Sequence, residues 1–345
     1  MTPDFQNFLI QHGASIEAGV VQHFNDTAHE LMATSQGTVL CDLSQFGTLR
    51  VSGEDAQSFL QNLLSNDIRE VTTAHAQLSS LNSPKGRMLA TMLICHSGND
   101  YLLQLPRVLC EPLRKKLSMY ILRAKVRITD ASDEIISLGL SGEHAQAILG
   151  SQFGELPQLP FDFLDTEHGS LIKISDTRFQ INIAAQQASK FWDTLSQSAQ
   201  PVGSLCWDWL NIRSGIPVIL PQTQEQFVPQ MANFELIGGV SFKKGCYPGQ
   251  EIVARMQYLG KLKRRMYLAH LDGNEAPQPG DELFSTDMEG QPSGIIVNAA
   301  PAPKGGYDML AVVQTSSQET QTVHWKSLQG AALAFSPPPY SLSNT

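Results

Sequence analysis

Two stretches of the chain repeat the same order of apolar and polar positions. In each, a short strand-like run (residues 49–51 and 138–140) is followed by Ser-Gly-Glu, which opens a predicted helix. An acid in the first helical turn is favoured by the helix dipole. Further apolar runs and a second helical stretch follow in both cases. Each stretch therefore predicts the order β-α-β-β-α-β, in which helices cover one face of an antiparallel sheet.

The predicted elements correspond between the two stretches. In the first we expect a helix at 54–64, strands at 87–95 and 101–105, a helix at 108–122 and a strand at 125–129. In the second we expect a helix at 143–150, strands at 170–175 and 178–184, and a helix at 186–198. The Ser-Gly-Glu match alone is short enough to be a coincidence, but the shared element order favours a duplicated unit.

The C-terminal part of the chain has a different pattern. From residue 262 onward, short apolar runs alternate with Pro-Gly, Glu-Gly and Gly-Gly, which is typical of a small antiparallel barrel. Residues 216–242 show little periodicity, and a loop of that length is usually functional. We therefore expect an α+β protein in three parts: a first repeat with the N-terminal segment (1–135), a second repeat (136–260) and a C-terminal β-barrel (261–345).

The charge is unevenly distributed along the chain. The net charge of −9 argues against a general nucleic-acid binder, yet residues 243–265 hold seven basic residues and one acid. Such a patch suits a small anionic ligand or an acidic partner. Alternatively, Lys261, Lys263 and Arg265 form the solvated side of a strand. No apolar run reaches membrane-spanning length and no signal peptide is visible, so we expect a cytoplasmic protein without a membrane partner.

The five cysteines are Cys41, Cys95, Cys110, Cys206 and Cys246. Cys41 and Cys95 follow apolar runs and are predicted to be buried. The odd count without disulfide-like spacing favours a reducing compartment. Since no Cys-x-x-Cys pair or nearby His cluster has zinc-ligand spacing, we predict no metal site.

The cysteine with a distinctive setting is Cys246, within Lys-Lys-Gly-Cys-Tyr-Pro-Gly-Gln-Glu at 243–251. Pro248 suits the first position of a helix through Gln250 and beyond, because its missing N–H would have no partner there. Cys246 would then lie at a positive helix end beside Lys243 and Lys244, and both features favour the reactive thiolate. The alternative is a glycine-rich turn around a small buried cysteine.

Residues 244–251 resemble the signature of the YgfZ-type folate-binding proteins, relatives of the glycine-cleavage T-protein that help maintain certain iron–sulfur enzymes. Residues 215–219, 227–233 and 238–243 support the resemblance. It implies a ring of domains around a channel for tetrahydrofolate, with the duplicated ferredoxin-like unit as most of the wall and the barrel closing it. It also implies that iron–sulfur client proteins are partners.

The resemblance implies a set of site residues. Cys246 is the functional, catalytic residue. The turn that borders the folate site, with the helix behind it and two further positions, supplies the folate-binding residues: Lys244, Gly245, Tyr247, Gly249, Gln250, Glu251, Arg255, Asn233 and Arg213.

Two positions depart from the T-protein pattern. After the turn at 82–87, Leu89 and Ala90 occupy the places of paired aspartates, one of which supports methylene transfer on the folate. Without a carboxylate there, aminomethyl transfer by that route lacks its acid or base. Arg213 replaces a glutamate that helps to hold the pterin ring in the T-protein, and a cation cannot accept the pterin's N–H donors.

Three functions are consistent with these features. The leading hypothesis is a tetrahydrofolate-binding accessory protein for the assembly or repair of iron–sulfur enzymes, acting through Cys246. The second is a folate-dependent aminomethyltransferase-like or demethylating enzyme. The third is a non-catalytic scaffold whose basic 243–265 stretch docks an acidic partner.

Overall fold

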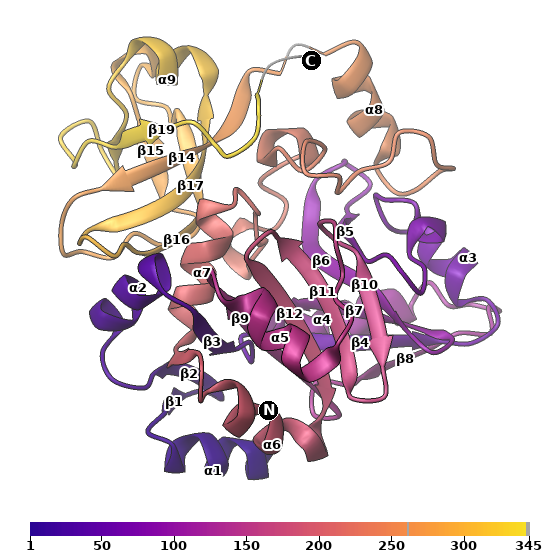
Figure 1. Cartoon of the computed structure of the whole chain (residues 1–345). Helices are drawn as coiled ribbons and strands as arrows, with labels where there is room; N and C mark the ends of the chain where they lie inside the picture. Colours follow the sequence, from indigo (N-terminus) through magenta and orange to yellow (C-terminus); the bar gives the residue numbers. More distant parts are fainter. Residues whose placement is uncertain (261, 343–345) are drawn as a thin grey trace. The chain divides into compact units, whose positions relative to one another are not determined.

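The computed structural model describes residues 1–260 and 262–342 (Figure 1). The chain folds into two compact units, each assembled from separate segments. The first unit contains residues 1–59, 68–77 and 93–207, and the second contains 60–67, 78–92 and the chain from Asp208 onward. One strand, β6 (Met88–Ser97), therefore begins in the second unit and ends in the first.

The first predicted repeat forms a sheet with the strand order β5-β6-β7-β4-β8. Its elements are β4 (Phe46–Ser52), α3 (Ala56–Gln61), β5 (Gln77–Asn82), β6, β7 (Asp100–Pro106), α4 (Arg107–Ser118) and β8 (Arg127–Asp130). The predicted strands and helices are confirmed, whereas β5 was not predicted. Its sequence, Gln-Leu-Ser-Ser-Leu-Asn, has no apolar alternation, although all six residues are buried.

The second predicted repeat forms a sheet with the order β10-β11-β12-β9-β3-β13. Its elements are β9 (Ile135–Ser141), α5 (Ala145–Phe153), β10 (Phe163–Thr166), β11 (Gly169–Ser175), β12 (Arg178–Ala184), α6 (Ala188–Leu195) and β13 (Gln200–Val202), with β3 (Val39–Asp42) added from the N-terminal segment. The order corresponds to that of the first sheet except that β3 lies between β9 and β13. The sequence pattern could not show this insertion, because β3 pairs with strands about one hundred residues or more away.

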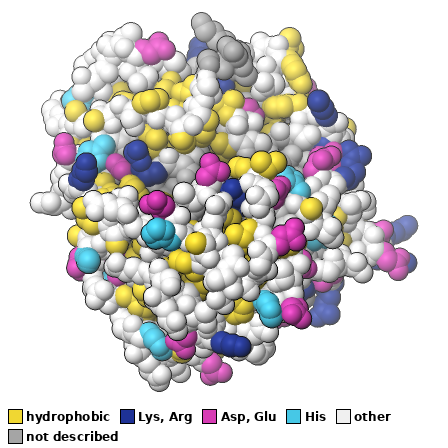
Figure 2. All heavy atoms as spheres, viewed as in Figure 1, with side chains coloured by type: hydrophobic (Ala, Val, Ile, Leu, Met, Phe, Trp, Pro, Cys, Tyr) yellow, Lys and Arg dark blue, Asp and Glu magenta, His cyan; other side chains and the backbone are white. Residues whose placement is uncertain are grey.

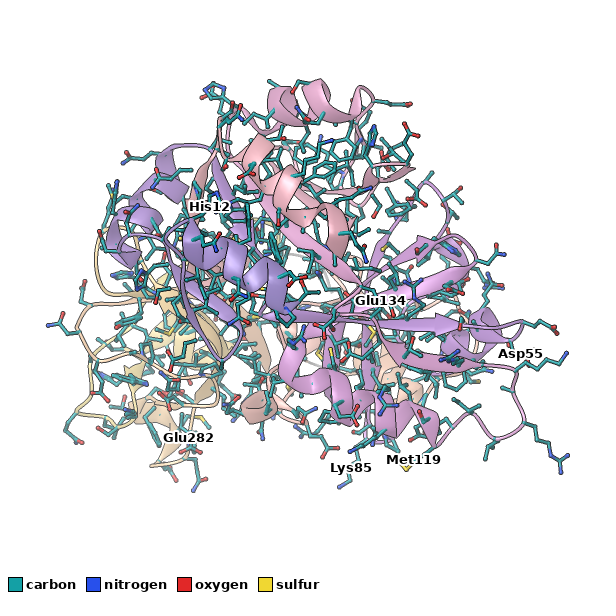
Figure 3. All side chains as sticks on the ribbon, turned by 90° about the horizontal axis from the view of Figure 1, so that it is seen from below. His12, Asp55, Lys85, Met119, Glu134 and Glu282 are labelled. Atoms are coloured by element: carbon teal, nitrogen blue, oxygen red, sulfur yellow. The ribbon has the colours of Figure 1, made fainter. Side chains whose placement is uncertain are left out.

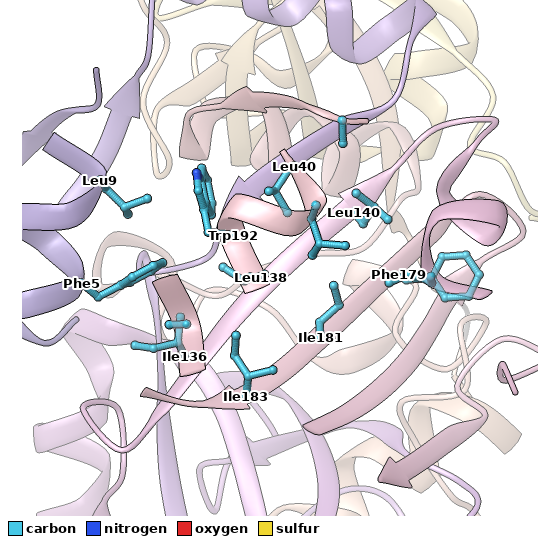
Figure 4. Close-up of a cluster of buried hydrophobic side chains, with 14 of the residues drawn as sticks. Phe5, Leu9, Leu40, Ile136, Leu138, Leu140, Phe179, Ile181, Ile183 and Trp192 are labelled. Carbon is cyan, nitrogen blue, oxygen red and sulfur yellow. The ribbon is translucent and has the colours of Figure 1, made fainter. Parts of the chain in front are cut away.

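The strand alternation of this second sheet separates an apolar face from a polar one. Leu138 and Leu140 of β9 pack with Trp192 of α6 and with Phe5 and Leu9 of α1 (Pro3–Gln11) in one core cluster (Figure 4). Trp192 is fully buried, with its ring edge-on to Phe5 at 6.2 Å between centroids. Successive strand residues point to opposite faces. The apolar positions therefore fix which face the helices cover.

The opposite face carries buried polar side chains. Gln180 Nε2 donates to Asn182 Oδ1 at 2.9 Å, and Ser137 Oγ donates to the same oxygen at 2.8 Å. Together with Thr48 and Gln104 of the other sheet, Gln180 and Asn182 line a cavity of about 10 Å³. That volume accommodates about one water molecule.

The N-terminal segment consists of α1, the hairpin β1 (Ser15–Glu17) and β2 (Val20–His23), and α2 (Thr27–Gln36). In the second unit, the main helices are the C-terminal end of α7 (Ser204–Arg213), α8 (Gln250–Tyr258) and α9 (Thr315–Thr320). None of the helices in the described residues is both long and apolar enough to span a membrane. On the face shown in Figure 2, acidic, basic and apolar side chains are interspersed.

The C-terminal strands form an antiparallel sheet of order β18-β15-β16-β17-β14-β19. They are β14 (Arg264–Leu271), β15 (Glu282–Phe284), β16 (Gly294–Pro301), β17 (Tyr307–Gln314), β18 (His324–Trp325) and β19 (Ala334–Ser336). The segment just before β19 pairs with the β18 region, through Leu333 N to Val323 O and Trp325 N to Ala331 O, both at 2.9 Å. The two edges of the sheet are thereby joined, and the predicted strands are confirmed.

One buried carboxylate holds the N-terminal segment of the first unit together. Glu30 of α2 is fully buried, and its Oε1 accepts the backbone N–H groups of Phe24 and Asn25 at 2.6 and 2.9 Å. Its Oε2 accepts the N–H of Gly203 at 2.8 Å. A single side chain thus satisfies three backbone donors from two distant segments.

We expect Glu30→Gln to lower the free energy of unfolding by roughly 1–3 kcal/mol, because the amide NH₂ would face a backbone N–H in place of an acceptor. Urea titration followed by circular dichroism measures the change. Glu17→Gln, at an exposed position of β1, is the matched control and should be nearly neutral. Equal effects of the two substitutions would contradict the role of Glu30.

Candidate functional site

The cysteine-containing turn ends later than the sequence predicts. Helix α8 begins at Gln250, and Gly249 precedes it in the left-handed conformation at φ +79° and ψ 4°. Gln250 N donates to Tyr247 O at 3.1 Å, so residues 247–250 form a turn with proline second and a left-handed glycine third, the type II pattern. The prediction that Pro248 is the first helical residue is therefore wrong. The Pro-Gly pair is itself a turn signal, and it overrides the preference of proline for a helix start.

Two glycine turns pack directly against one another at this point. A Cβ on Gly249 would lie 2.5 Å from the Cα of Gly86 and 2.5 Å from the carbonyl oxygen of Ser83. A Cβ on Gly86 would in turn lie 2.9 Å from the Cβ of Ile252 in α8. The predicted turn at 82–87 and the start of α8 can therefore approach this closely only because residues 86 and 249 are glycines. Lys85, at the tip of this turn, is exposed (Figure 3).

Lys244 anchors the turn from the other side. Its side chain is buried, and Nζ donates to the carbonyl oxygens of Gln61, Leu64 and Asn66 at 2.6, 2.5 and 3.1 Å. These carbonyls belong to the last residue of α3 and to the segment after it, where a cation also complements the helix dipole. The ammonium lies 5.1 Å from the centroid of the Tyr247 ring. The sequence predicted a cation that favours the thiolate, but the structure directs this ammonium to backbone oxygens.

Cys246 differs from the other cysteines in its exposure. It is exposed, whereas Cys41, Cys95, Cys110 and Cys206 are buried. The predicted burial of Cys41 and Cys95 is confirmed, and the alternative of a buried Cys246 is wrong. Burial raises the pKa of the Cys95 thiol to about 12, which keeps it protonated at neutral pH.

The remaining predicted residues of the turn and helix divide into buried and exposed groups. Tyr247 is buried, which raises the pKa of its phenol, and Gln250 Nε2 donates to Lys244 O at 3.4 Å. Gly245 is exposed, and a Cβ there would meet nothing within 4 Å. Glu251 and Arg255 are exposed on α8. The turn therefore has a fixed inner side and an open side that carries the thiol.

Asn233 lies in a buried polar network. Its Nδ2 donates to Met266 O at 2.7 Å and to the Tyr340 hydroxyl at 3.4 Å, and Arg265 Nη1 donates to its Oδ1 at 3.4 Å. Arg265 also forms a buried ion pair with Glu235, whose pKa is raised by desolvation. Tyr340, which sequence reasoning missed, donates to Gly215 O at 3.0 Å. Residues from four separate segments of the second unit meet here.

The basic stretch 243–265 is thus not one solvated patch. Lys244 and Arg265 are buried and bonded within the protein, which corrects the expectation that Arg265 lies on a solvated strand side. Lys243 and Lys263 are exposed, and Lys261 lies outside the described residues. The alternation of residues along β14 could not reveal the burial of Arg265, because its partner Glu235 is thirty positions away in the sequence.

Arg213, the last residue of α7, belongs to a different cluster. Its Nη1 lies 3.9 Å from Asp308 Oδ2, which also accepts Trp209 Nε1 at 2.8 Å. The other oxygen of Asp308 pairs with His270 Nδ1 at 2.8 Å. Within the described residues no group of three or more His, Cys, Asp and Glu side chains could hold a metal ion.

The positions of the T-protein carboxylates are apolar and enclosed. Leu89 and Ala90 are buried in β6, with exposed fractions of 9% and 0%. The adjoining backbone is covered by the long loop: Met88 N donates to Phe227 O at 2.8 Å, and Gln224 Nε2 donates to Leu89 O at 2.6 Å. The loop at 216–242 therefore packs along β6. Leu89 and Ala90 themselves carry no group that could transfer a proton.

We expect Lys244→Met to lower the free energy of unfolding by roughly 3 kcal/mol, because it leaves three carbonyls without their charged donor. Denaturant titration checks this. The adjacent Lys243→Met removes the same charge from an exposed position and should change stability by less than about 0.5 kcal/mol. A Lys244→Met protein as stable as the Lys243→Met control would show that the anchor does not hold the turn.

Comparison with known proteins places the chain in a family. Residues 8–243 match the family model described as GCVT N-terminal domain. The chain is 30% identical over 305 residues to the tRNA-modifying protein YgfZ of Escherichia coli O127:H6 (strain E2348/69 / EPEC), covering 88% of this chain and 93% of the relative. It is 29% identical over 307 residues to the tRNA-modifying protein YgfZ of Klebsiella pneumoniae (strain 342), with 88% and 94% covered.

Among solved structures, the glycine cleavage system aminomethyltransferase T from Bartonella henselae has a similar fold. The TM-score is 0.79 at 17% identity, and the match covers 99% of this chain and 97% of that one. The resemblance in the 244–251 signature is thereby confirmed along the chain. The protein belongs to the YgfZ family and has the mixed α/β fold of the GcvT-like proteins.

Proposed function

We propose that this chain is a tetrahydrofolate-binding accessory protein for the assembly or repair of iron–sulfur enzymes, and that Cys246 is the residue through which it acts. One observation carries the proposal. Of the five cysteines, only Cys246 is exposed, and it lies in a turn whose backbone is fixed on one side by Lys244 and on the other by Gly249. A thiol held in this way is available to a partner while its position stays defined.

The proposed folate-binding residues are those that the family signature indicates: Lys244, Gly245, Tyr247, Gly249, Gln250, Glu251, Arg255, Asn233 and Arg213. The fit to a folate is supported by unpartnered buried polar atoms beside the turn, on Asn82, Ser83 and Tyr247. Tetrahydrofolate would supply a carrier for a one-carbon unit. Accepting that unit, forming a mixed disulfide and contacting a cluster are three roles that each use the exposed thiol of Cys246.

The name of the relatives suggests one group of clients. They are called tRNA-modifying proteins. We propose that the clients of this chain include iron–sulfur enzymes that modify tRNA, so that the chain affects tRNA through a protein. The prediction that the chain is no general nucleic-acid binder stays a prediction.

Two other functions are weaker. The fold similarity to an aminomethyltransferase favours transfer chemistry, but Leu89 and Ala90 leave the expected carboxylate positions apolar. The docking-scaffold function is weaker because Arg265 is buried in an ion pair with Glu235, so it is not available on the surface to an acidic partner. We also propose that the two similar sheets reflect a duplicated ferredoxin-like unit, that the unit closes into a ring around the folate, and that the predicted domain limits at 135 and 260 describe this arrangement.

We expect Cys246→Ala to retain reduced-folate binding and to lose function in cells. The measurement is the activity of an iron–sulfur enzyme in cells that lack this chain and are supplied with each variant. Cys95→Ala, which removes a buried thiol, should restore activity as well as the wild type does. Full rescue by Cys246→Ala would remove the cysteine from the proposal.

We expect Arg213→Glu to raise the affinity for tetrahydrofolate about tenfold, because a carboxylate accepts pterin N–H donors that a guanidinium cannot, and such a bond contributes roughly 1.5 kcal/mol. Calorimetric titration under anaerobic conditions measures the affinity. Arg213→Gln controls for the loss of the ion pair with Asp308. An affinity that is the same in all three proteins would show that residue 213 does not contact the pterin.

A further inference from the structure

The first unit carries a second concentration of cations, in helix α4 and the segment that leads to β8. Residues 107–127 contain seven basic residues and one acid, the same numbers as residues 243–265. In 243–265, Lys244 and Arg265 are buried. In 107–127 none of the basic residues is buried: Arg107, Arg114, Lys115, Lys116, Arg123, Lys125 and Arg127. This stretch therefore presents all of its cations at the surface.

Helix α4 has an exposed face that is partly apolar. Its core side is made by Leu109, Leu113 and Leu117. The outer side follows the same helical spacing at 108, 112, 115 and 119, where Val, Pro, Lys and Met stand. Val108 and Met119 are 61% and 69% exposed, and Met119 projects from the surface in Figure 3. Between these two residues the outer face runs about 16 Å along the helix.

The apolar surface continues past the end of the helix. Tyr120 and Leu122 are 43% and 91% exposed, and Leu122 adopts the left-handed conformation at φ +46°, which is rare for a bulky side chain. Tyr120 N donates to Leu117 O at 3.0 Å and Ala124 N to Ile121 O at 2.7 Å, so the segment turns back at the helix end. Four of the ten large apolar side chains exposed in the described residues lie in this stretch. Single exposed apolar residues are ordinary, whereas a cluster of them rimmed by charge marks an interaction surface.

Three of the cations beside this apolar surface have no acidic partner. Lys116, Arg123 and Arg127 form no ion pair within residues 1–260 and 262–342. Lys116 precedes Met119 by about one helical turn, and Arg123 follows Leu122 directly. The other basic residues of the stretch form ion pairs of 2.6 to 3.2 Å with carboxylates of the same unit: Arg107, Arg114, Lys115 and Lys125. The surface thus combines unpaired positive charge with exposed apolar area.

The chemistry of the surface selects the kind of partner. Exposed aliphatic side chains are stabilised when apolar atoms of a partner cover them, by about 25 cal/mol for each Å². A nucleic acid offers mainly phosphate and sugar to such a surface. Nucleic acids and anionic membranes also present many charges at once, and the net charge of −9 opposes their approach. A short acidic segment of a protein interacts with the nearby cations and supplies apolar side chains as well.

We propose that the outer face of α4 and residues 119–127 form a docking surface for an acidic, amphipathic segment of a partner protein. The apolar side chains of that segment cover Met119 and Leu122. Its carboxylates pair with Lys116, Arg123 and Arg127. The surface lies within the first unit, and the inference does not depend on the proposed role of Cys246 or on folate binding.

The test uses designed helical peptides as probes. A fluorescein-labelled peptide with Leu on one face and Glu beside it should bind the wild-type protein, which fluorescence anisotropy measures. Met119→Ser/Leu122→Ser and Lys116→Glu/Arg123→Glu should each weaken binding about tenfold, because each removes one half of the complementarity. Both pairs lie at the surface, so the Tm of the unbound protein should stay unchanged. The charge-reversed protein should prefer a peptide in which Lys replaces Glu.

Leu159→Ser/Lys190→Glu is the matched control. It changes one exposed apolar side chain and one exposed cation elsewhere in the first unit, and it should bind the peptide as the wild type does. Absence of binding to the Leu-Glu peptide, equal weakening in the control, or equal affinity for a peptide with Ser in place of Leu would overturn the inference. Binding of phosphatidylserine vesicles or of tRNA through Met119 and Leu122, without binding of the peptide, would assign the surface to a membrane or a nucleic acid and would also overturn it.

Discussion

The geometry of the site depends on one buried ammonium. Lys244 places its charge among the carbonyls of residues 61–66, and the desolvation cost is offset because all three contacts are charge-assisted hydrogen bonds. Since residues 64 and 65 pair with β5, the lysine joins the cysteine turn to the strand that ends at Asn82. The close contact of Gly249 with Gly86 fixes the other end. Cys246 lies between these two constraints and is exposed.

The sequence predicted the parts of the fold that depend on apolar periodicity. The alternation of Leu138 and Leu140 and the helical spacing around Trp192 are direct consequences of a core that lies on one side of a sheet. Strand β5 was missed because its Ser79, Ser80 and Asn82 are polar and yet buried. Ser79 and Ser80 are hydrogen-bonded to residues 65 and 66, and Ser80 Oγ also donates to Asn82 Oδ1. No local pattern encodes such contacts.

For the cysteine turn, the sequence pattern predicted the contacts of its cations wrongly, and the assignment of the segment as a functional site stays a prediction. The motif singled out Cys246 among the five cysteines, and the structure shows that this thiol is exposed. The direction of Lys244 could not be predicted, since its acceptors are about 180 positions away and sequence neighbours suggest only the thiol. The same limit applies to Arg265, whose charge is neutralised by Glu235 inside the protein. A run of basic residues in the sequence does not show which of them are exposed. Whether a cation can meet a ligand depends on its burial and on its partners inside the protein.

A similar fold can carry different side chains at corresponding positions. A TM-score of 0.79 at 17% identity means that the core pattern is kept while most side chains differ, and function follows from the site. Here the carboxylate positions are apolar, and neutral polar atoms at Asn82, Ser83 and Tyr247 lie unpaired. Those atoms lower the stability of the unliganded protein, so a ligand that pairs them stabilises the folded state in proportion to its differential binding.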